Sequence, residues 1–374
     1  MRVLFVTLGT RSVPSSRIRV YQYVDRLRSE GIDARVLPYA ISRRYERFLD
    51  SVRRLKRLPR IAYYPPRLAI EAGWRAGHAF DRLRLLAEIP AADVVYLQKA
   101  VLPRPYRIAL RALRKPFVFD FDDAIFTAKL SDREETRAQS RRRVRAIESL
   151  AREANAVVTN DSPFLEEYAQ ARARRAVVLP AAVEPKFFAV PERSDRRAGI
   201  VLGWVGLAVN FHNLRWLGPA LAEVGRRHPE ARLKIVWGGG AFPEFDFGLP
   251  VEREAWSYER EVQQGRSFDV GLLPLVESEF NRGKMARKAI EYAALGTPAV
   301  CSPVGLNFRV FRDGETVLLA RTHEEWVDAI CRLIEDPLSR ARLGMAAAAA
   351  AREHYSFERV AARLIDLLRE IAGR

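Results

Sequence analysis

The sequence predicts an α/β fold with two doubly wound, Rossmann-like domains that face a central cleft. Short apolar segments alternate with stretches of helical periodicity along the whole 374-residue chain. Apolar strands of this kind are typical of parallel sheets that helices cover on both faces. The chain is too long for one ordinary domain. A stretch rich in proline and charge, Pro185 to Arg197, divides the alternation into two series.

The first series opens with a strand, a loop from Gly9 to Ser16 and a helix that Gly31 ends. The strands expected here are Val3 to Leu8, Ala34 to Leu37, Asp93 to Leu97, Pro116 to Asp120 and Ala156 to Thr159, and the segment Val177 to Pro180 ends this half. The helices expected are Arg17 to Glu30, Pro105 to Arg114, Asp132 to Ala154 and Pro163 to Ala169.

The second series repeats the pattern. Its expected strands are Ile200 to Val205, Leu233 to Val236, Asp269 to Leu273, Ala299 to Cys301 and Val317 to Leu318. Its expected helices are one from the turn Gly206 to Asn213 as far as about His228, then Gly283 to Leu295, Glu324 to Glu335, Pro337 to His354 and Phe357 to Ile371. We therefore predict domains at residues 1–188 and 189–355, followed by a separate helix within 356–374.

The composition indicates a globular, cytoplasmic protein. Hydrophobic residues make up 48% of the chain, yet no apolar run reaches the roughly 18 residues of a membrane span. The N-terminus enters a strand directly, without a signal-peptide cleavage site. Cys301 and Cys331 offer no disulfide framework. No histidine pairs with a carboxylate at metal-ligand spacing, so we expect no protein-bound metal.

The formal net charge of +17 suggests anionic partners. Basic and apolar residues alternate at helical spacing in Ser42 to Arg60 and Arg67 to Leu86. Such helices could lie on an anionic membrane surface, or they could be solvated basic faces. We expect no nucleic-acid partner, because no helix-turn-helix, zinc-finger or aromatic RNA-binding pattern is found.

The segment Arg282 to Gly305, RGKMARKAIEYAALGTPAVCSPVG, is the most informative. In a helix that begins at Gly283, Lys284, Lys288 and Glu291 share one face. The helix N-terminus and the two ammonium groups would bind phosphate, while Glu291 could accept hydrogen bonds from a ribose diol. The alternative is a surface helix in which Lys288 and Glu291 form a solvated ion pair.

Further candidates follow the strands of the first series, where ligands of such sheets bind. Asp120, Asp122 and Asp123 form an acidic turn at the carboxyl end of one strand, where a residue of the cleft should lie. The alternative is a capped turn before a helix. The remaining candidates in this half are Ser15, Ser16, Arg17, Arg19, Gln98 and Lys99, of which Arg19 could equally be a surface residue.

In order and spacing, these pieces resemble the GT-B glycosyltransferases, in particular the large retaining group called family 4. The matching segments are SSRIRVYQYVDRLRSEG, FDFDDAIF, AVVTNDSPFLEEYA, VVLPAAVEPKFF, GWVG, FDVGLLPL and the Arg282 to Gly305 segment. The last helix, SFERVAARLIDLL, resembles the one that crosses back to the first domain in that fold. The resemblance implies that the first domain binds the acceptor and the second binds the nucleotide sugar.

The resemblance also assigns roles by position. Glu291 matches the second glutamate of the family's paired-glutamate motif, which binds the donor ribose, but the first glutamate is replaced by Gly283. The basic residues that the family often has between Gly206 and His212 are missing. Lys284 and Lys288 are therefore the candidates to neutralise the diphosphate and to support its departure.

The other assignments concern the walls of the cleft. Gly203 and Gly206 would let the backbone approach a phosphate, and His212 could face the donor. Ser16 and Arg17 would face the diphosphate or the acceptor from the opposite wall. Chemistry at an anomeric carbon usually calls for paired carboxylates, and on this assignment Asp122 and Asp123 would bind or orient the acceptor.

The implied activity is transfer of a sugar from a nucleotide-diphosphate sugar to a hydroxyl of a glycan, a lipid-linked saccharide or a small metabolite, by a hexosyltransferase-type enzyme that retains configuration. The donor is a substrate, and no tightly bound cofactor is expected. Two alternatives stay open, a nucleotide-sugar epimerase on the same fold and a catalytically silent protein that binds nucleotide sugars.

Overall fold

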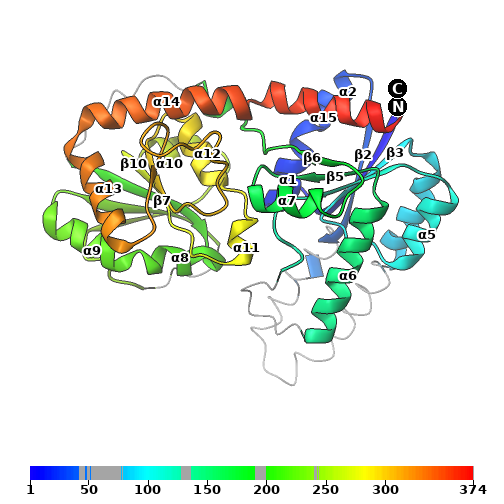
Figure 1. Cartoon of the computed structure of the whole chain (residues 1–374), viewed down its shortest axis with the longest axis horizontal. Helices are drawn as coiled ribbons and strands as arrows, with labels where there is room; N and C mark the ends of the chain where they lie inside the picture. The colour runs from blue at the N-terminus through cyan, green and yellow to red at the C-terminus, as the bar shows by residue number, and fades with distance from the viewer. Residues whose placement is uncertain are drawn as a thin grey trace.

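The computed structural model describes residues 1–41, 47–48, 51, 77, 79–127, 136–189, 199–239, 242 and 244–373. The two basic segments, Ser42 to Arg60 and Arg67 to Leu86, lie mostly outside these residues. The described part of the chain forms two α/β units side by side, each built around one sheet (Figure 1).

The first unit holds a parallel sheet with the strand order β2-β1-β3-β4-β5-β6. Its strands are Arg2–Gly9 (β1), Asp33–Ile41 (β2), Val94–Gln98 (β3), Phe117–Phe121 (β4), Ala156–Thr159 (β5) and Ala176–Val178 (β6). Its helices include Pro14–Arg19 (α1), Val24–Ser29 (α2), Arg104–Ala112 (α5), Arg137–Glu153 (α6) and Pro163–Gln170 (α7).

The second unit holds a parallel sheet with the order β12-β11-β10-β7-β8-β9. Its strands are Val201–Leu207 (β7), Arg232–Gly238 (β8), Val251–Ala255 (β9), Val270–Leu273 (β10), Ala299–Cys301 (β11) and Leu318–Leu319 (β12). Its helices are Phe211–Trp216 (α8), Gly218–Arg227 (α9), Glu261–Arg266 (α10), Glu279–Arg282 (α11), Arg287–Ala294 (α12), His323–Glu335 (α13) and Pro337–Tyr355 (α14).

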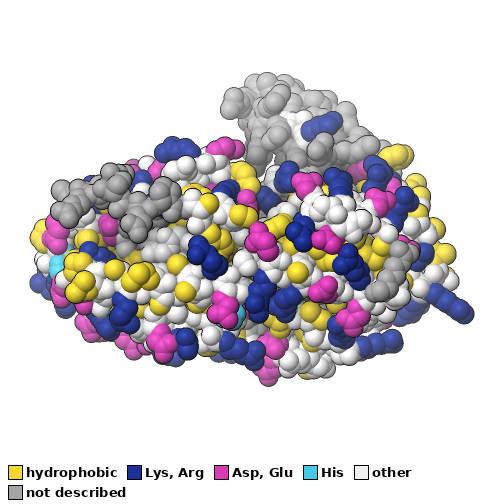
Figure 2. Space-filling view, turned by 90° about the horizontal axis from the view of Figure 1, so that it is seen from above, with side chains coloured by type: hydrophobic (Ala, Val, Ile, Leu, Met, Phe, Trp, Pro, Cys, Tyr) yellow, Lys and Arg dark blue, Asp and Glu magenta, His cyan; other side chains and the backbone are white. Residues whose placement is uncertain are grey.

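The last helix, Phe357–Ile371 (α15), returns to the first sheet. Its buried residues Val360, Leu364 and Leu368 belong to the same apolar cluster as strands β1 and β3. In Figure 1, α14 runs along the second unit and α15 continues along the first, so the two chain ends lie close together. On the face that carries these two helices, Lys and Arg side chains are interspersed with Asp and Glu over the described residues (Figure 2).

In the described part of the chain, three expected helices are interrupted, and two elements were not expected. The helix expected as far as about His228 is divided at Leu217 into α8 and α9. The first helix does not run unbroken from Arg17, because a 3₁₀ turn at Tyr21–Tyr23 separates α1 from α2. Strand β9 and helix α10 were not expected; β9 (VEREA) is an edge strand whose side chains are half-buried or exposed, so it lacks an apolar pattern. The expected helix from Gly283 is divided, with a turn between α11 and α12.

Candidate functional site

A cavity of about 330 Å³ lies where the carboxyl ends of the two sheets meet. The first unit contributes helix α1 and the turn after β4, including Ser15, Arg17, Asp122 and Asp123. The second unit contributes the ends of β7, β8 and β10, the residues that follow β9, and the segment from Lys284 to Glu291. The cavity therefore brings together eight of the predicted site residues, from both halves of the chain.

Glu291 lies at the cavity wall within an ion-pair triad on helix α12. Arg287 Nε donates to one carboxylate oxygen at 2.7 Å, and Lys288 Nζ donates to the other at 2.6 Å. Burial by itself would raise the pKa of Glu291, but the two cations and their hydrogen bonds lower it to about 2. The expected ion pair with Lys288 is thus present, but it is buried rather than solvated, and Arg287 is a partner that the sequence analysis missed.

Lys284 is not on the helix face where the sequence placed it. It lies in the turn between α11 and α12, which begins only at Arg287, so the expected helix N-terminus at Gly283 was wrong. Its side chain still lines the cavity, and Nζ donates to Asn210 Oδ1 at 2.7 Å. Burial lowers the pKa of Lys284. Among the described residues this ammonium forms no ion pair.

Arg17 is a second cation of the cavity and comes from the opposite unit. Its guanidinium lies 5.6 Å from the ring centre of Trp256 and 5.1 Å from that of Tyr258. Its Nε atom is buried and has no hydrogen-bond partner among the described residues. Trp256 and Tyr258 follow strand β9, which the sequence analysis did not predict, so these aromatic residues were missed.

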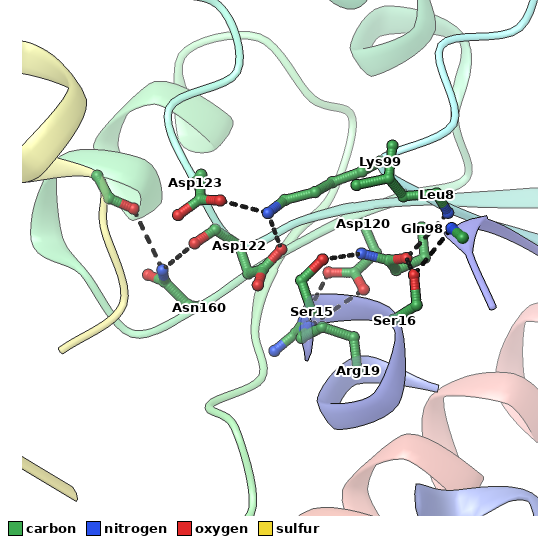
Figure 3. A network of polar contacts seen from close by, with 12 residues as sticks. Leu8, Ser15, Ser16, Arg19, Gln98, Lys99, Asp120, Asp122, Asp123 and Asn160 are labelled. Atoms are coloured by element: carbon green, nitrogen blue, oxygen red, sulfur yellow. Dashed lines mark hydrogen bonds and ion pairs between the residues drawn. The ribbon is translucent and has the colours of Figure 1, made fainter. Parts of the chain in front are cut away.

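The turn after β4 presents two carboxylates that share one cation. Lys99 Nζ lies 2.7 Å from Asp122 Oδ1 and also contacts Asp123 Oδ2 (Figure 3). Burial raises the pKa of Asp123, although Lys99 opposes this effect. Lys99 itself has a left-handed backbone, with φ of 51°, which is uncommon outside glycine and often marks a functional site.

Four other predicted residues form buried supports behind this wall (Figure 3). Arg19 and Asp120 form a fully buried ion pair with an N–O distance of 2.6 Å, so Arg19 is not a surface residue and Asp120 is not in the cavity. Ser16 is also buried; its hydroxyl donates to Gln98 Oε1 at 2.9 Å and accepts from the Gly9 amide. The neighbouring Ser15, rather than Ser16, lines the cavity.

The remaining predicted residues divide between the cavity and the framework. Gly206 lines the cavity, whereas Gly203 lies within β7, where a Cβ atom would come 1.9 Å from the Phe268 ring. His212 is exposed, bonds the Val209 carbonyl and is not among the lining residues. Gly283 contacts the first unit instead of the cavity, since a Cβ atom there would lie 2.7 Å from Ala124 Cβ.

One histidine does have carboxylate neighbours, contrary to the expectation from spacing. His228 Nε2 lies 3.2 Å from Glu335, and the ligand atoms of His228, Cys331 and Glu335 lie within 4.8 Å of one another. The sequence could not show this because α9 and α13 bring the residues together. None of them lines the cavity described above.

Part of the sequence is similar to known glycosyltransferases. Residues 218–366 match the profile of a family described as "Glycosyl transferase-like". A D-inositol 3-phosphate glycosyltransferase of Corynebacterium efficiens is 30% identical over 200 residues, which are 48% of this chain and 46% of that protein. The chain thus aligns with about half the length of the curated relatives it matches.

The fold is similar to solved structures over almost the whole chain. HepE of Anabaena in complex with UDP matches with a TM-score of 0.70 and 17% identity, covering 99% of this chain and 100% of that one. Sucrose-phosphate synthase of Thermosynechococcus elongatus matches with a TM-score of 0.66 and 15% identity, covering 99% of each. The chain therefore has the GT-B fold. It resembles the family 4-like glycosyltransferases, as the sequence motifs implied.

Proposed function

We propose that the protein is a glycosyltransferase that moves a sugar from a nucleotide-diphosphate sugar to an acceptor hydroxyl. The observation that carries this proposal is the pair of cations, Lys284 and Arg17, that line the interdomain cavity from opposite units. Neither forms an ion pair among the described residues. Both residues are half-buried at the cavity wall, and partly desolvated cations without an ion-pair partner favour an anionic ligand, so a bound diphosphate would balance their charge.

The second unit offers a matching site for the nucleoside. Glu291 is held ionised by Arg287 and Lys288 and is an acceptor suited to a ribose diol. Trp256 offers an aromatic face at the same cavity. The complexes of HepE with UDP and UDP-glucose, in a protein of the same fold, support a uridine nucleotide as the first donor to test.

The first unit would hold the acceptor. We infer that residues 1–188 form the acceptor domain and 189–355 the donor domain, with 356–374 packed back on the first. Asp122 and Asp123 would accept hydrogen bonds from acceptor hydroxyls. Lys284 and Lys288 would stabilise the departing diphosphate, whose oxygen takes the acceptor proton while the bond from the anomeric carbon to the acceptor forms on the same face. Configuration would then be retained.

The direct test is a transfer assay. Purified protein is incubated with UDP-sugars and a panel of saccharide, lipid-linked and polyol phosphate acceptors, and products are identified by mass spectrometry. We expect UDP release that depends on the acceptor and a product heavier by one sugar. An epimerase would convert the donor without an acceptor. A silent binding protein would leave every donor unchanged, and either result would contradict the proposal.

We also infer that the first unit touches an anionic membrane surface, which would suit a lipid-linked acceptor. Leu83 lies on helical residues 79–88, and Ile108 lies on α5; their exposed fractions are 66% and 53%. The exposed Arg104 lies on the same helix as Ile108. None of the described helices is long and apolar enough to cross a bilayer.

Co-sedimentation with vesicles tests the membrane proposal. We expect the protein to sediment with phosphatidylglycerol-containing vesicles at low salt and to bind less tightly after Leu83→Glu or Ile108→Glu. Equal recovery with neutral and anionic vesicles would contradict it.

A further inference from the structure

One short segment of the first unit forms hydrogen bonds to the second unit beside the cavity. It consists of Asn160, Asp161 and Ser162, which follow strand β5 and precede helix α7. All three side chains are at least nine-tenths buried. We call this segment the clasp.

The clasp binds the turn that carries Lys284. Asn160 Nδ2 donates to the Gly283 carbonyl at 3.3 Å, and Ser162 Oγ donates to the Arg282 carbonyl at 2.6 Å. The two carbonyls that receive these bonds belong to the residues immediately before Lys284. Their position therefore fixes where the Lys284 backbone enters the cavity.

The side-chain amide of Asn160 also bonds the turn after β4, which forms the opposite wall of the cavity. Asn160 Nδ2 donates to the backbone carbonyl of Asp122 at 2.8 Å, and its Oδ1 atom accepts from the Ser162 amide at 2.7 Å. In Figure 3, Asn160 lies beside Asp122, with one dashed line to Asp122 and another to a segment of the second unit. One side chain thus links the turn with the two carboxylates to the turn with the lysine.

Close packing around Gly283 and Gly305 makes this arrangement sensitive to position. A Cβ atom at residue 283 would lie 2.8 Å from Leu165 Cδ2, which belongs to the first unit. Behind the turn, a Cβ atom at residue 305 would lie 2.4 Å from the Lys284 carbonyl. The Lys284 turn is therefore held between Gly305 on one side and the clasp on the other.

The geometry points to Asn160 and Ser162 as positioning residues for the donor diphosphate, acting through Lys284. This inference rests on the proposed function, because it takes Lys284 as the diphosphate-binding cation. The third clasp residue makes different contacts, since Asp161 Oδ2 accepts from Tyr355 Oη at 2.6 Å and from Asn307 Nδ2 at 3.1 Å. These contacts join the two units without touching the Lys284 turn.

A double-mutant cycle on UDP affinity tests the inference. Asn160→Asp keeps the shape of the side chain but cannot donate to the two carbonyls, and we expect it to weaken UDP binding about tenfold. In a Lys284→Met background, the same change should have little further effect, because the group it positions is gone. Ser162→Ala serves as a second variant if Asn160→Asp does not fold. Tyr355→Phe, which loosens the interface elsewhere, should leave UDP affinity close to that of the unaltered protein.

The outcomes separate the two proposals. If Asn160→Asp or Ser162→Ala weakens UDP binding equally with and without Lys284, or if Tyr355→Phe weakens it as much, the clasp is only part of the interface and the inference is wrong. If Lys284→Met alone leaves UDP affinity unchanged, the proposed donor site is wrong and the inference falls with it.

Discussion

At the scale of single residues, charge pairing distinguishes cations that already have a carboxylate partner from cations that have none among the described residues. Glu291 has two cationic partners, and Asp122 and Asp123 share Lys99. Lys284 bonds only a neutral amide oxygen. Breaking a buried pair leaves an uncompensated charge, whereas an unpaired buried cation gains stability when an anion binds.

Glu291 gives a pH-dependent prediction. Its pKa is about 2 in the folded protein, below the ordinary value of 4.5. A carboxylate with a lowered pKa stabilises the fold above its unfolded pKa, and that contribution is lost as the pH falls from about 4.5 towards 2. In Glu291→Gln, the loss of unfolding free energy over this interval should be smaller by up to about 3 kcal/mol.

Urea unfolding of both proteins at pH 7, 4.5 and 3 measures the effect. Parallel losses of stability in the two proteins between pH 4.5 and 3 would show that the triad does not hold Glu291 ionised.

At the scale of elements, the sequence predicted what periodicity and capping encode locally. Helix α15 has the predicted bounds, Phe357–Ile371, because its apolar stripe is regular. The break before α12 was missed because residues 283–286 suit a helix. In the structure, the carbonyls of residues 282 and 283 instead accept hydrogen bonds from the side chains of Ser162 and Asn160. Contacts so distant in sequence leave no local signal.

The candidate site likewise contains residues that local patterns predict and residues whose roles depend on contacts distant in sequence. Its carboxylates, lysines and Arg17 were found because they follow strands or a recognisable motif. The ion pair of Arg19 with Asp120 joins residues that are 101 positions apart, so its buried role could not be predicted. Trp256 was missed because the strand before it has no apolar alternation.

Strand β7 provides a test of packing at this scale. At Gly203, an added Cβ atom would lie 1.9 Å from Phe268 Cγ, and the ring is fully buried. Gly203→Ala should therefore lower the free energy of unfolding by about 1–3 kcal/mol. Urea unfolding measures this, with Gly203→Ala/Phe268→Ala as the matched variant, because alanine lacks the overlapping Cγ and Cδ atoms.

The smaller side chain in the double variant should relieve the overlap, so its cost should be less than the sum of the two single changes. Additive costs would mean that Gly203 and Phe268 do not compete for the same space.

At the scale of the whole molecule, the last helix of the chain, α15, completes the apolar core of the first unit. Leu364 of α15 is fully buried in the cluster that includes Val3 and Phe5 of β1. Truncating such a side chain removes buried apolar surface and leaves a cavity. Besides the chain connection, two features join the units: the packing of α15 on the first sheet and the hydrogen bonds of the clasp.

Leu364→Ala should lower the free energy of unfolding by about 2–5 kcal/mol. Arg359→Ala, at an exposed position of the same helix, is the control and should change it by less than about 0.5 kcal/mol. Differential scanning calorimetry should show the loss for Leu364→Ala in the transition of the first unit, and an unchanged midpoint would contradict the packing described.

The central claim, a diphosphate site built around an unpaired lysine, is tested most directly by calorimetric titration of UDP into three proteins: the unaltered chain, Lys284→Met and Lys115→Met. Lys115 is the matched control because its ammonium also donates to a neutral oxygen, the Ala92 carbonyl at 2.8 Å, but does not line the cavity. We predict measurable UDP binding that weakens about 10- to 100-fold in Lys284→Met and stays within about threefold in Lys115→Met. Absence of UDP binding to the unaltered chain, or equal losses in the two variants, would contradict the account.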